Sequence, residues 1–428
     1  MKRKRLKDIL RFGRLVQSVR GPSGQTLAAS IASQALTLIS GVIAARALGV
    51  EGRGTLALLW LLPLTIVLLG GIGIPQATTY YVARELGNAK AVVLTSVKIS
   101  VFLAFALSSA YGGILLLVFA GGDDFAALEA LLSAALIPML LAQNLGVATL
   151  LGMRRYRAFN LSRVVPALMY TLTISTLFIS NHASLPWILG VTVGSWATGA
   201  LITWSLVFRD MQTQGKRAGA SPRNILSFGI RGVVGSASPI DDVRIDQLMI
   251  GLLMDSRALG LYVAALAFCN LPRFIAQSIG AVSFPRIAAA RSGMVAWQIA
   301  ERAFRNGVVL IALCVGTLLA TIQFLLPMFF GNDFSDAVSI GQILLLAAFF
   351  LSVHRLLTEL ARGLGHPGYG SITEVVNLLV FLLAVLLIAT PATTAGIATA
   401  VLVGGLASSA LLALLLGRLK KIQLGGRL

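Results

Sequence analysis

The chain has 428 residues, of which 57% are hydrophobic and only 12% are charged, and its mean hydropathy is +0.87. Soluble domains carry about 25% charged residues, so this chain lacks the polar surface that a water-soluble protein of its size needs. The net charge of +19 could suit nucleic acid, but the basic residues lie in short clusters between apolar runs. This pattern excludes a nucleic-acid partner and indicates a membrane topology signal.

Twelve apolar segments are long enough to cross a membrane as helices, which takes about 20 residues each. They predict an all-α polytopic membrane protein in which no loop is long enough for a soluble domain. The predicted spans are residues 25–48, 55–77, 95–120, 126–151, 160–181, 185–208, 225–254, 259–284, 305–330, 337–361, 370–390 and 393–417.

The basic residues between these spans are distributed unequally over the two sides of the membrane. If the N-terminus is cytoplasmic, the cytoplasmic segments hold 28 Lys and Arg residues, and the opposite side holds only Arg46, Arg53 and Arg257. Cytoplasmic loops carry an excess of Lys and Arg. The distribution therefore supports the count of twelve and predicts that both termini lie in the cytoplasm.

The N-terminal segment, residues 1–24, mixes basic and apolar residues at helical spacing between Leu6 and Val16. This spacing predicts an amphipathic helix on the inner membrane surface, attracted by anionic lipids. The alternative is a basic tail without fixed structure that only sets the topology.

A repeated four-residue motif suggests that the chain contains an internal duplication. Arg-Ala-Leu-Gly occurs at 46–49 and again at 257–260, an offset of 211 residues. Each copy would close the first helix of a six-helix half and open the second. We therefore predict two halves, 25–208 and 225–417, joined by a cytoplasmic linker at 209–224 and followed by a basic cytoplasmic tail at 418–428. Because six is an even number, both halves insert the same way up, and the repeat axis runs along the membrane normal.

No catalytic, metal-binding or cofactor-binding pattern is found. The three histidines are scattered without metal-ligand spacing, and no phosphate-binding loop of the Walker type is present. Cys269 and Cys314 lie in apolar runs and are interpreted as packing residues.

Charged residues inside the spans require a structural or functional explanation, because inserting each one at the centre of a membrane helix costs about 2.5–3.5 kcal/mol. Nearly all of them lie in the second half, where Pro239 is expected to kink or interrupt the seventh span. One interpretation is a water-filled cavity that holds an anionic substrate, lined by Arg231, Arg244, Arg273 and Arg355. Carboxylates that could bind a coupling ion or act as a gate are Asp242, Asp246, Glu359 and Glu374.

Internal salt bridges are the structural alternative for these charges. Arg355 and Glu359 are four residues apart, and Asp246 could pair with Arg244. Asp242 and Asp246 would share one helix face, and Arg273 has no opposite charge near it in sequence. The amides Gln143 and Asn144 in the fourth span are expected to make interhelical hydrogen bonds rather than to contact substrate.

Three stretches resemble bacterial polysaccharide (O-antigen type) flippases. Residues 45–54 resemble the end of the first helix in that family, and residues 246–251, 259–262 and 284–286 are similar to its seventh and eighth helices. The resemblance covers the whole chain in layout, with local motifs of moderate specificity. The family belongs to the multidrug/oligosaccharidyl-lipid/polysaccharide (MOP) exporter superfamily, which also contains multidrug exporters and lipid II flippases.

The resemblance implies two pseudo-symmetric six-helix lobes that form a V-shaped cleft and open alternately to the cytoplasm and the periplasm. The implied cargo is an undecaprenyl-diphosphate-linked oligosaccharide, flipped between the leaflets of the bacterial inner membrane. Membrane lipids and other polysaccharide assembly proteins are the further partners implied.

Three alternatives are weaker. A cation-coupled multidrug or small-molecule antiporter would carry a more developed acidic site in its first half. A lipid II flippase usually has fourteen helices. A membrane glycosyltransferase or polymerase would place catalytic residues in a large outer loop, and all the outer loops of this chain are short.

Overall fold

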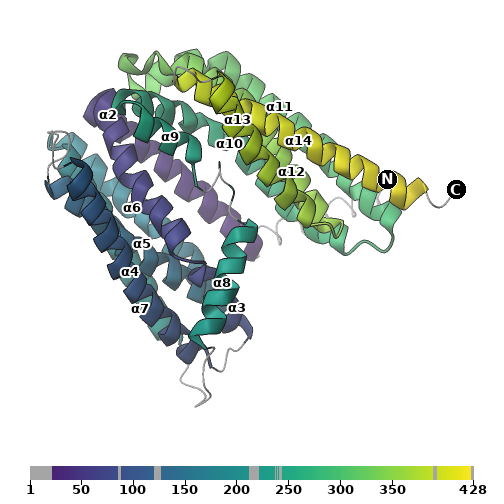
Figure 1. The fold of residues 1–428 in the computed structure, drawn as a ribbon, viewed down its shortest axis with the longest axis horizontal. Coiled ribbons are helices and arrows are strands. Elements are labelled where there is room, and N and C mark those ends of the chain that lie inside the picture. The colour runs from purple at the N-terminus through teal and green to yellow at the C-terminus, as the bar shows by residue number, and fades with distance from the viewer. Residues whose placement is uncertain are drawn as a thin grey trace, which may run out of the picture. The chain divides into compact units, whose positions relative to one another are not determined.

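A computed structural model describes residues 22–84, 88–119, 127–211, 221–236, 238, 240, 243–388 and 393–425. These residues form helices and short connections, and no strand occurs among them. Most of the predicted amphipathic segment, residues 1–21, lies outside them. In chain order (Figure 1), the helices are α2 (Pro22–Gly70), α3 (Ile74–Arg84), α4 (Ala89–Phe119), α5 (Ala127–Gly152), α6 (Tyr156–Ile179), α7 (Leu185–Asp210), α8 (Pro222–Ser236), α9 (Ile245–Leu253), α10 (Ser256–Ala288), α11 (Gly293–Phe330), the 3₁₀ turn η2 (Asn332–Phe334), α12 (Ala337–Gly363), α13 (Gly368–Ile388) and α14 (Thr394–Gly425).

Within the described residues, ten helices are long and apolar enough to cross a membrane. The segment α2 consists of two helices that meet at Gly49, where φ is 69° and ψ is −172°, and it holds the first predicted span and the second as far as Gly70. The seventh predicted span is divided into α8 and α9, which are too short to cross alone. The all-α polytopic class is therefore confirmed, whereas the count of twelve stays a prediction.

Large apolar side chains cover the outside of these helices. Phe102 and Phe105 on α4 and Leu386 and Leu387 on α13 are each at least 69% exposed. Such a surface is unsuited to water and is the surface that lipid tails require. The chain is a multi-pass membrane protein.

The helices gather into two compact units. The first comprises the chain up to Ala47 together with Leu59–Gly235, and the second comprises Leu48–Leu58 together with the chain from Ser236. The interrupted seventh span is thus shared, with α8 in the first unit and α9 in the second. The predicted halves, 25–208 and 225–417, would instead keep this span whole. A break frees its two parts to pack with different helices.

Hydroxyl groups join the helices of the first unit. The Ser133 hydroxyl of α5 donates to the Leu59 carbonyl of α2 at 2.7 Å and lies 2.9 Å from the Tyr111 hydroxyl of α4. Buried Val67 and Leu140 pack in the same cluster. In lipid, apolar packing offers helices little net driving force, so buried hydrogen bonds of this kind contribute to specific association.

In the second unit, α12 packs against α10, α11, α13 and α14. Buried Trp297, Leu357 and Leu416 bring α11, α12 and α14 together in one apolar cluster. The central position of α12 matters for the site, because His354, Arg355 and Glu359 all lie on this helix.

Two glycines bring helices of the second unit into backbone contact. A Cβ on Gly54 would lie 1.7 Å from the Ser256 carbonyl oxygen, and a Cβ on Gly260 would lie 2.0 Å from the Val50 carbonyl oxygen. The contacts are reciprocal, because Val50 and Ser256 each precede their glycine by four residues. This pairing corresponds to an offset of 206 residues. The repeated Arg-Ala-Leu-Gly is not placed equivalently, since Gly49 lies at the kink of α2 and Gly260 lies in the opening turns of α10.

Candidate functional site

The second predicted span breaks within the first unit. Helix α2 ends at Gly70 and α3 begins at Ile74, and between them Ile72 and Gly73 have φ values of 50° and 63°. A β-branched residue in this left-handed region is strained. Gly73 also touches α8, because a Cβ there would lie 2.2 Å from the Gly229 carbonyl oxygen. Irregular backbone at membrane depth is stable only where protein buries it or where it lines a wet cavity.

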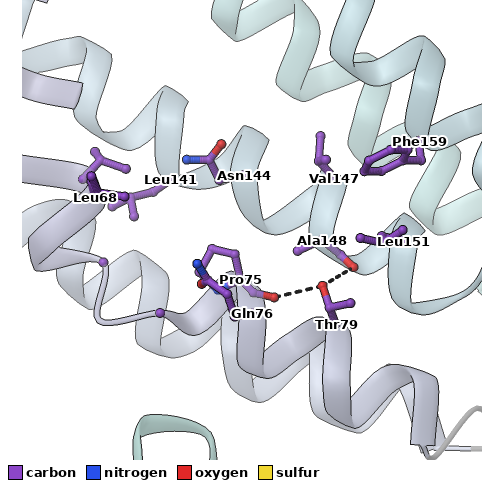
Figure 2. Close-up of a pocket in the computed structure, with 13 residues that line it drawn as sticks. Leu68, Pro75, Gln76, Thr79, Leu141, Asn144, Val147, Ala148, Leu151 and Phe159 are labelled. Atoms are coloured by element: carbon purple, nitrogen blue, oxygen red, sulfur yellow. Dashed lines mark hydrogen bonds between the residues drawn. The ribbon is translucent and has the colours of Figure 1, made fainter. Parts of the chain in front are cut away.

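A pocket of about 370 Å³ lies beside this break (Figure 2). Its polar side chains are Gln76, Thr79 and Asn144, and none of its lining residues is charged. The Thr79 hydroxyl of α3 lies 2.9 Å from the Ala148 carbonyl of α5 and 3.1 Å from the Pro75 carbonyl. The lining consists of Val67, Leu68, Gly71, Gly73, Pro75, Gln76, Thr79, Leu141, Asn144, Val147, Ala148, Leu151 and Phe159.

The neighbouring amides Gln143 and Asn144 have different roles. Gln143 is buried, donates from Nε2 to the Ser162 carbonyl at 2.7 Å, and accepts from the Thr203 hydroxyl at 3.0 Å. The prediction of interhelical hydrogen bonds is confirmed for Gln143. It is wrong for Asn144, which is exposed in the pocket and makes no hydrogen bond to any described residue. Successive helical residues point about 100° apart, so one amide faces other helices and the next faces the pocket.

The four predicted cavity arginines do not all lie in one unit. Arg231 lies in α8 of the first unit, and its side chain is outside the described part of the chain. Arg244 precedes α9 with a φ of 55°, and Arg273 is half-buried in α10. Both have interaction partners, so Arg273 is not the unpaired cation that the sequence predicts. Arg355 of α12 is half-buried, and its Nε is buried without a hydrogen-bond partner among the described residues.

Glu359 does not form the predicted ion pair with Arg355. Its Oε1 instead lies 3.2 Å from Nη1 of Arg362, one turn further along α12. Its side chain packs over Gly280 of α10, where an added Cβ would lie 2.7 Å from Cγ of Glu359. Packing against α10 therefore decides which arginine this carboxylate meets.

Asp246 is buried at the start of α9. Its Oδ2 accepts a 2.7 Å hydrogen bond from the Tyr262 hydroxyl of α10, while its Oδ1 has no hydrogen-bond partner in the described part of the chain. Asp246 and Tyr262 both belong to the stretches that resemble polysaccharide flippases, and this hydrogen bond explains structurally why both residues are present. Asp242 lies outside the described residues. Because α9 begins at Ile245, the helical spacing expected between Asp242 and Asp246 does not apply.

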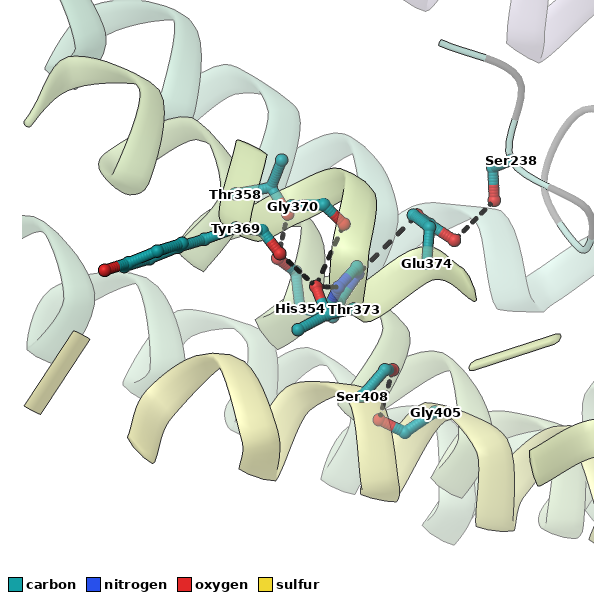
Figure 3. A network of polar contacts seen from close by, with 9 residues as sticks. All are labelled: Ser238, His354, Thr358, Tyr369, Gly370, Thr373, Glu374, Gly405 and Ser408. Atoms are coloured by element: carbon teal, nitrogen blue, oxygen red, sulfur yellow. Dashed lines mark hydrogen bonds and ion pairs between the residues drawn. The ribbon is translucent and has the colours of Figure 1, made fainter. Parts of the chain in front are cut away.

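A polar network joins α12, α13 and the segment between α8 and α9 (Figure 3). Buried His354 has Nε2 2.8 Å from the Thr373 hydroxyl and Nδ1 3.7 Å from Oε1 of Glu374. The Ser238 hydroxyl donates to Oε2 of Glu374 at 3.1 Å. Thr373 donates to a backbone carbonyl, that of Tyr369 at 2.9 Å, which leaves its oxygen to accept from Nε2. The contact between Nδ1 of His354 and Glu374 is attractive if a proton lies on either group. Without such a proton, the Nδ1 lone pair and the carboxylate repel each other.

The family model described as "Polysaccharide biosynthesis protein" matches residues 23–290, which is more than half of the chain. The chain belongs to the polysaccharide biosynthesis protein family. No curated protein matches it by sequence.

Solved transporter structures share the fold of this family member at low sequence identity. An inward-facing MATE multidrug transporter of the MOP superfamily is 14% identical, with a TM-score of 0.71 over 92% of this chain and 94% of that one. Lipid II flippase MurJ in an inward closed conformation is 12% identical, with a TM-score of 0.69 over 92% and 87%. A MOP transporter from Pyrococcus furiosus, whose binding pocket is described as having reverse polarity, is 16% identical, with a TM-score of 0.60 over 95% and 97%.

These identities establish the fold and not the cargo. The family match confirms that the resemblance to polysaccharide proteins is right, and the solved structures show that the fold is that of MOP-superfamily transporters.

Sequence reasoning missed the pocket residues Gln76 and Phe159 as well as His354. A signal for the pocket existed, since Gly70, Gly71, Gly73 and Pro75 punctuate an apolar run and such interruptions mark binding sites in transporters. An ionisable residue inside a span is itself a candidate functional residue, so His354 could have been singled out despite its lack of metal-ligand spacing.

Proposed function

We propose that this family member flips an undecaprenyl-diphosphate-linked oligosaccharide from the cytoplasmic to the periplasmic leaflet of the bacterial inner membrane by alternating access. The observation that carries the proposal is the match of residues 23–290 to a polysaccharide biosynthesis family, on a chain with the fold of transporters. In this proposal both termini are cytoplasmic, which is supported by the predicted topology, because its twelve spans would leave 28 basic residues on one side of the membrane and three on the other.

Charge favours an anionic cargo. The cytoplasm is electrically negative, so moving each negative charge outward gains about 2.3 kcal/mol per 100 mV. Cationic side chains would offset the removal of a diphosphate from water. We assign this role first to Arg355, whose Nε is buried without a partner in the described chain. Arg244 and Arg273, which belong to the same unit as Arg355, would contribute further positive charge, and Arg231 of the first unit is a separate candidate cation.

Glu374 is the carboxylate best suited to a coupling ion or gate. It accepts from Ser238, which lies in the interruption of the seventh span, and it faces buried His354. Binding of a proton or sodium ion there would change the hydrogen bond to the interruption. Asp246 is the second candidate because its Oδ1 has no hydrogen-bond partner in the described chain, and Asp242 the third. Glu359 is weaker because Arg362 already neutralises it.

A multidrug antiporter is the second candidate, favoured by the likeness of the fold to the MATE transporter. Deletion of the gene distinguishes the two functions. We expect lipid-linked oligosaccharide to accumulate and surface polysaccharide to disappear, with recovery by the wild type but not by Arg355→Ala. Normal surface polysaccharide combined with greater sensitivity to cationic drugs would overturn the flippase proposal in favour of the antiporter.

A further inference from the structure

The pocket beside the break in the second span has the composition of a site for neutral sugars. Its lining combines the amides of Gln76 and Asn144, the Thr79 hydroxyl and the Phe159 ring with apolar side chains. An ion that entered this lining would lose its hydration without meeting an opposite charge, which is costly. A cationic drug therefore does not suit the pocket, and a diphosphate would meet no charge among the lining residues themselves.

The two amides are free to bind a ligand. Each offers a carbonyl acceptor and an NH₂ donor, and a sugar hydroxyl both donates and accepts. Neither Gln76 nor Asn144 makes a hydrogen bond to any described residue, whereas the amide of adjacent Gln143 is occupied on both sides. Figure 2 shows Gln76 on α3 and Asn144 on α5, on facing helices, so that the amides can address a ligand from two sides.

The rest of the lining suits the C–H faces of a sugar ring. Leu141, Val147 and Leu151 of α5 give an apolar wall, and Phe159 adds an aromatic ring. The guanidinium of Arg163 lies 5.4 Å from the centroid of this ring and helps to hold it. A volume of about 370 Å³ falls in the range of small-molecule sites. It has room for a sugar ring or two rather than for a whole oligosaccharide.

We propose that this pocket is a sugar-binding subsite, which takes a neutral, hydroxyl-rich ring of the cargo while cations elsewhere take the diphosphate. The identity of the cargo rests on the proposed function. The preference of the pocket for neutral sugars does not rest on the proposed function, because sugar binding can be measured without transport.

Thiol protection measures binding to the full chain in lipid nanodiscs. Val147→Cys places a thiol in the pocket while both amides remain, Cys314→Ser removes a half-buried thiol, and Cys269 is buried. The probe is the oligosaccharide released by mild acid from the cell's undecaprenyl diphosphate pool. We expect it to slow labelling by a water-soluble maleimide about fivefold or more, and pyrophosphate and tetraphenylphosphonium to leave labelling unchanged.

Replacing the two pocket amides, Gln76 and Asn144, with leucine tests their role in sugar binding specifically. Gln76→Leu with Asn144→Leu removes at least two hydrogen bonds and should weaken protection about tenfold. Gln298→Leu, the same change at an exposed amide of α11, should leave protection intact. Protection that survives the double variant, protection by tetraphenylphosphonium, or equal labelling with every probe would overturn the subsite.

A transport assay separates this proposal from the proposed function. In proteoliposomes, the wild type should flip the glycan-bearing lipid faster than undecaprenyl diphosphate alone, and the double variant should lose that preference. A double variant that keeps the wild-type ratio overturns the subsite. If the wild type flips neither lipid, the proposed function fails, whereas the protection of Val147→Cys still decides whether the pocket binds sugar.

Discussion

Alanine at Gly54 tests the backbone contact within the second unit. Its Cβ would lie 1.7 Å from the Ser256 carbonyl oxygen and 2.9 Å from the Gly260 nitrogen, where ordinary contact needs 3.4–4 Å. The two segments must therefore separate by about 1.7 Å, and since both neighbours are backbone atoms no rotamer change can help. Overpacking costs about 1–3 kcal/mol, and we expect the upper end of that range. The better helix propensity of alanine offsets little of this overpacking cost, because membrane helices remain helical in the unfolded reference state.

Thermal unfolding of the purified chain in nanodiscs measures this cost. At about 2–4 °C per kcal/mol for a unit of this size, Gly54→Ala should lower the midpoint by about 5–10 °C. Gly260→Ala should behave alike, and the double variant should lose less than the sum because both act on one contact. Gly316→Ala is the matched control, since a Cβ there meets nothing within 4 Å. A Gly54→Ala protein as stable as the Gly316→Ala protein would refute the contact.

Three further predictions concern polar side chains. Gln143→Leu removes two interhelical hydrogen bonds and should lower the unfolding free energy by about 1–2 kcal/mol in the same assay; wild-type stability would contradict this. Tyr262→Phe removes the hydroxyl that donates to buried Asp246 and should lower the unfolding free energy by about 1–3 kcal/mol, partly recovered when Asp246→Asn is added. A midpoint equal to that of the wild type would show that this hydrogen bond contributes nothing. Arg355→Gln should slow flipping of the lipid-linked diphosphate about tenfold or more with the fold intact, while Arg257→Gln, at an exposed ion pair, should flip normally; equal rates for both would remove Arg355 from the substrate path.

The fold class could be predicted because it depends on quantities that are local in sequence. The length of each apolar run and the alternation of Lys and Arg need no knowledge of which helices touch. Pro239 likewise predicts an interruption of the seventh span, and the structure has one between Ser236 and Ile245. The break at Gly71–Gly73 was not predicted. Its glycines are a local signal, but packing against Gly229, about 150 residues away, decides whether such a break is stable.

The partners of the charged and polar residues could not be predicted, because they depend on how each helix is rotated about its axis. Glu359 has Arg355 and Arg362 within one turn, and only its packing over Gly280 decides between them. His354 meets Glu374 because α12 and α13 lie together, a contact that spacing within one helix cannot show. Sequence spacing thus limits the candidates, and tertiary packing selects among them.

Leaflet exchange in sealed proteoliposomes tests the central claim most directly. The purified chain is reconstituted with undecaprenyl-diphosphate-linked oligosaccharide, and the fraction that a membrane-impermeant glycosidase can reach is followed over time. The account predicts that the accessible fraction rises in vesicles with the wild-type chain, faster when the compartment of origin is electrically negative, and that Arg355→Gln slows this rise about tenfold. A rate in wild-type vesicles no higher than in protein-free vesicles would contradict the account.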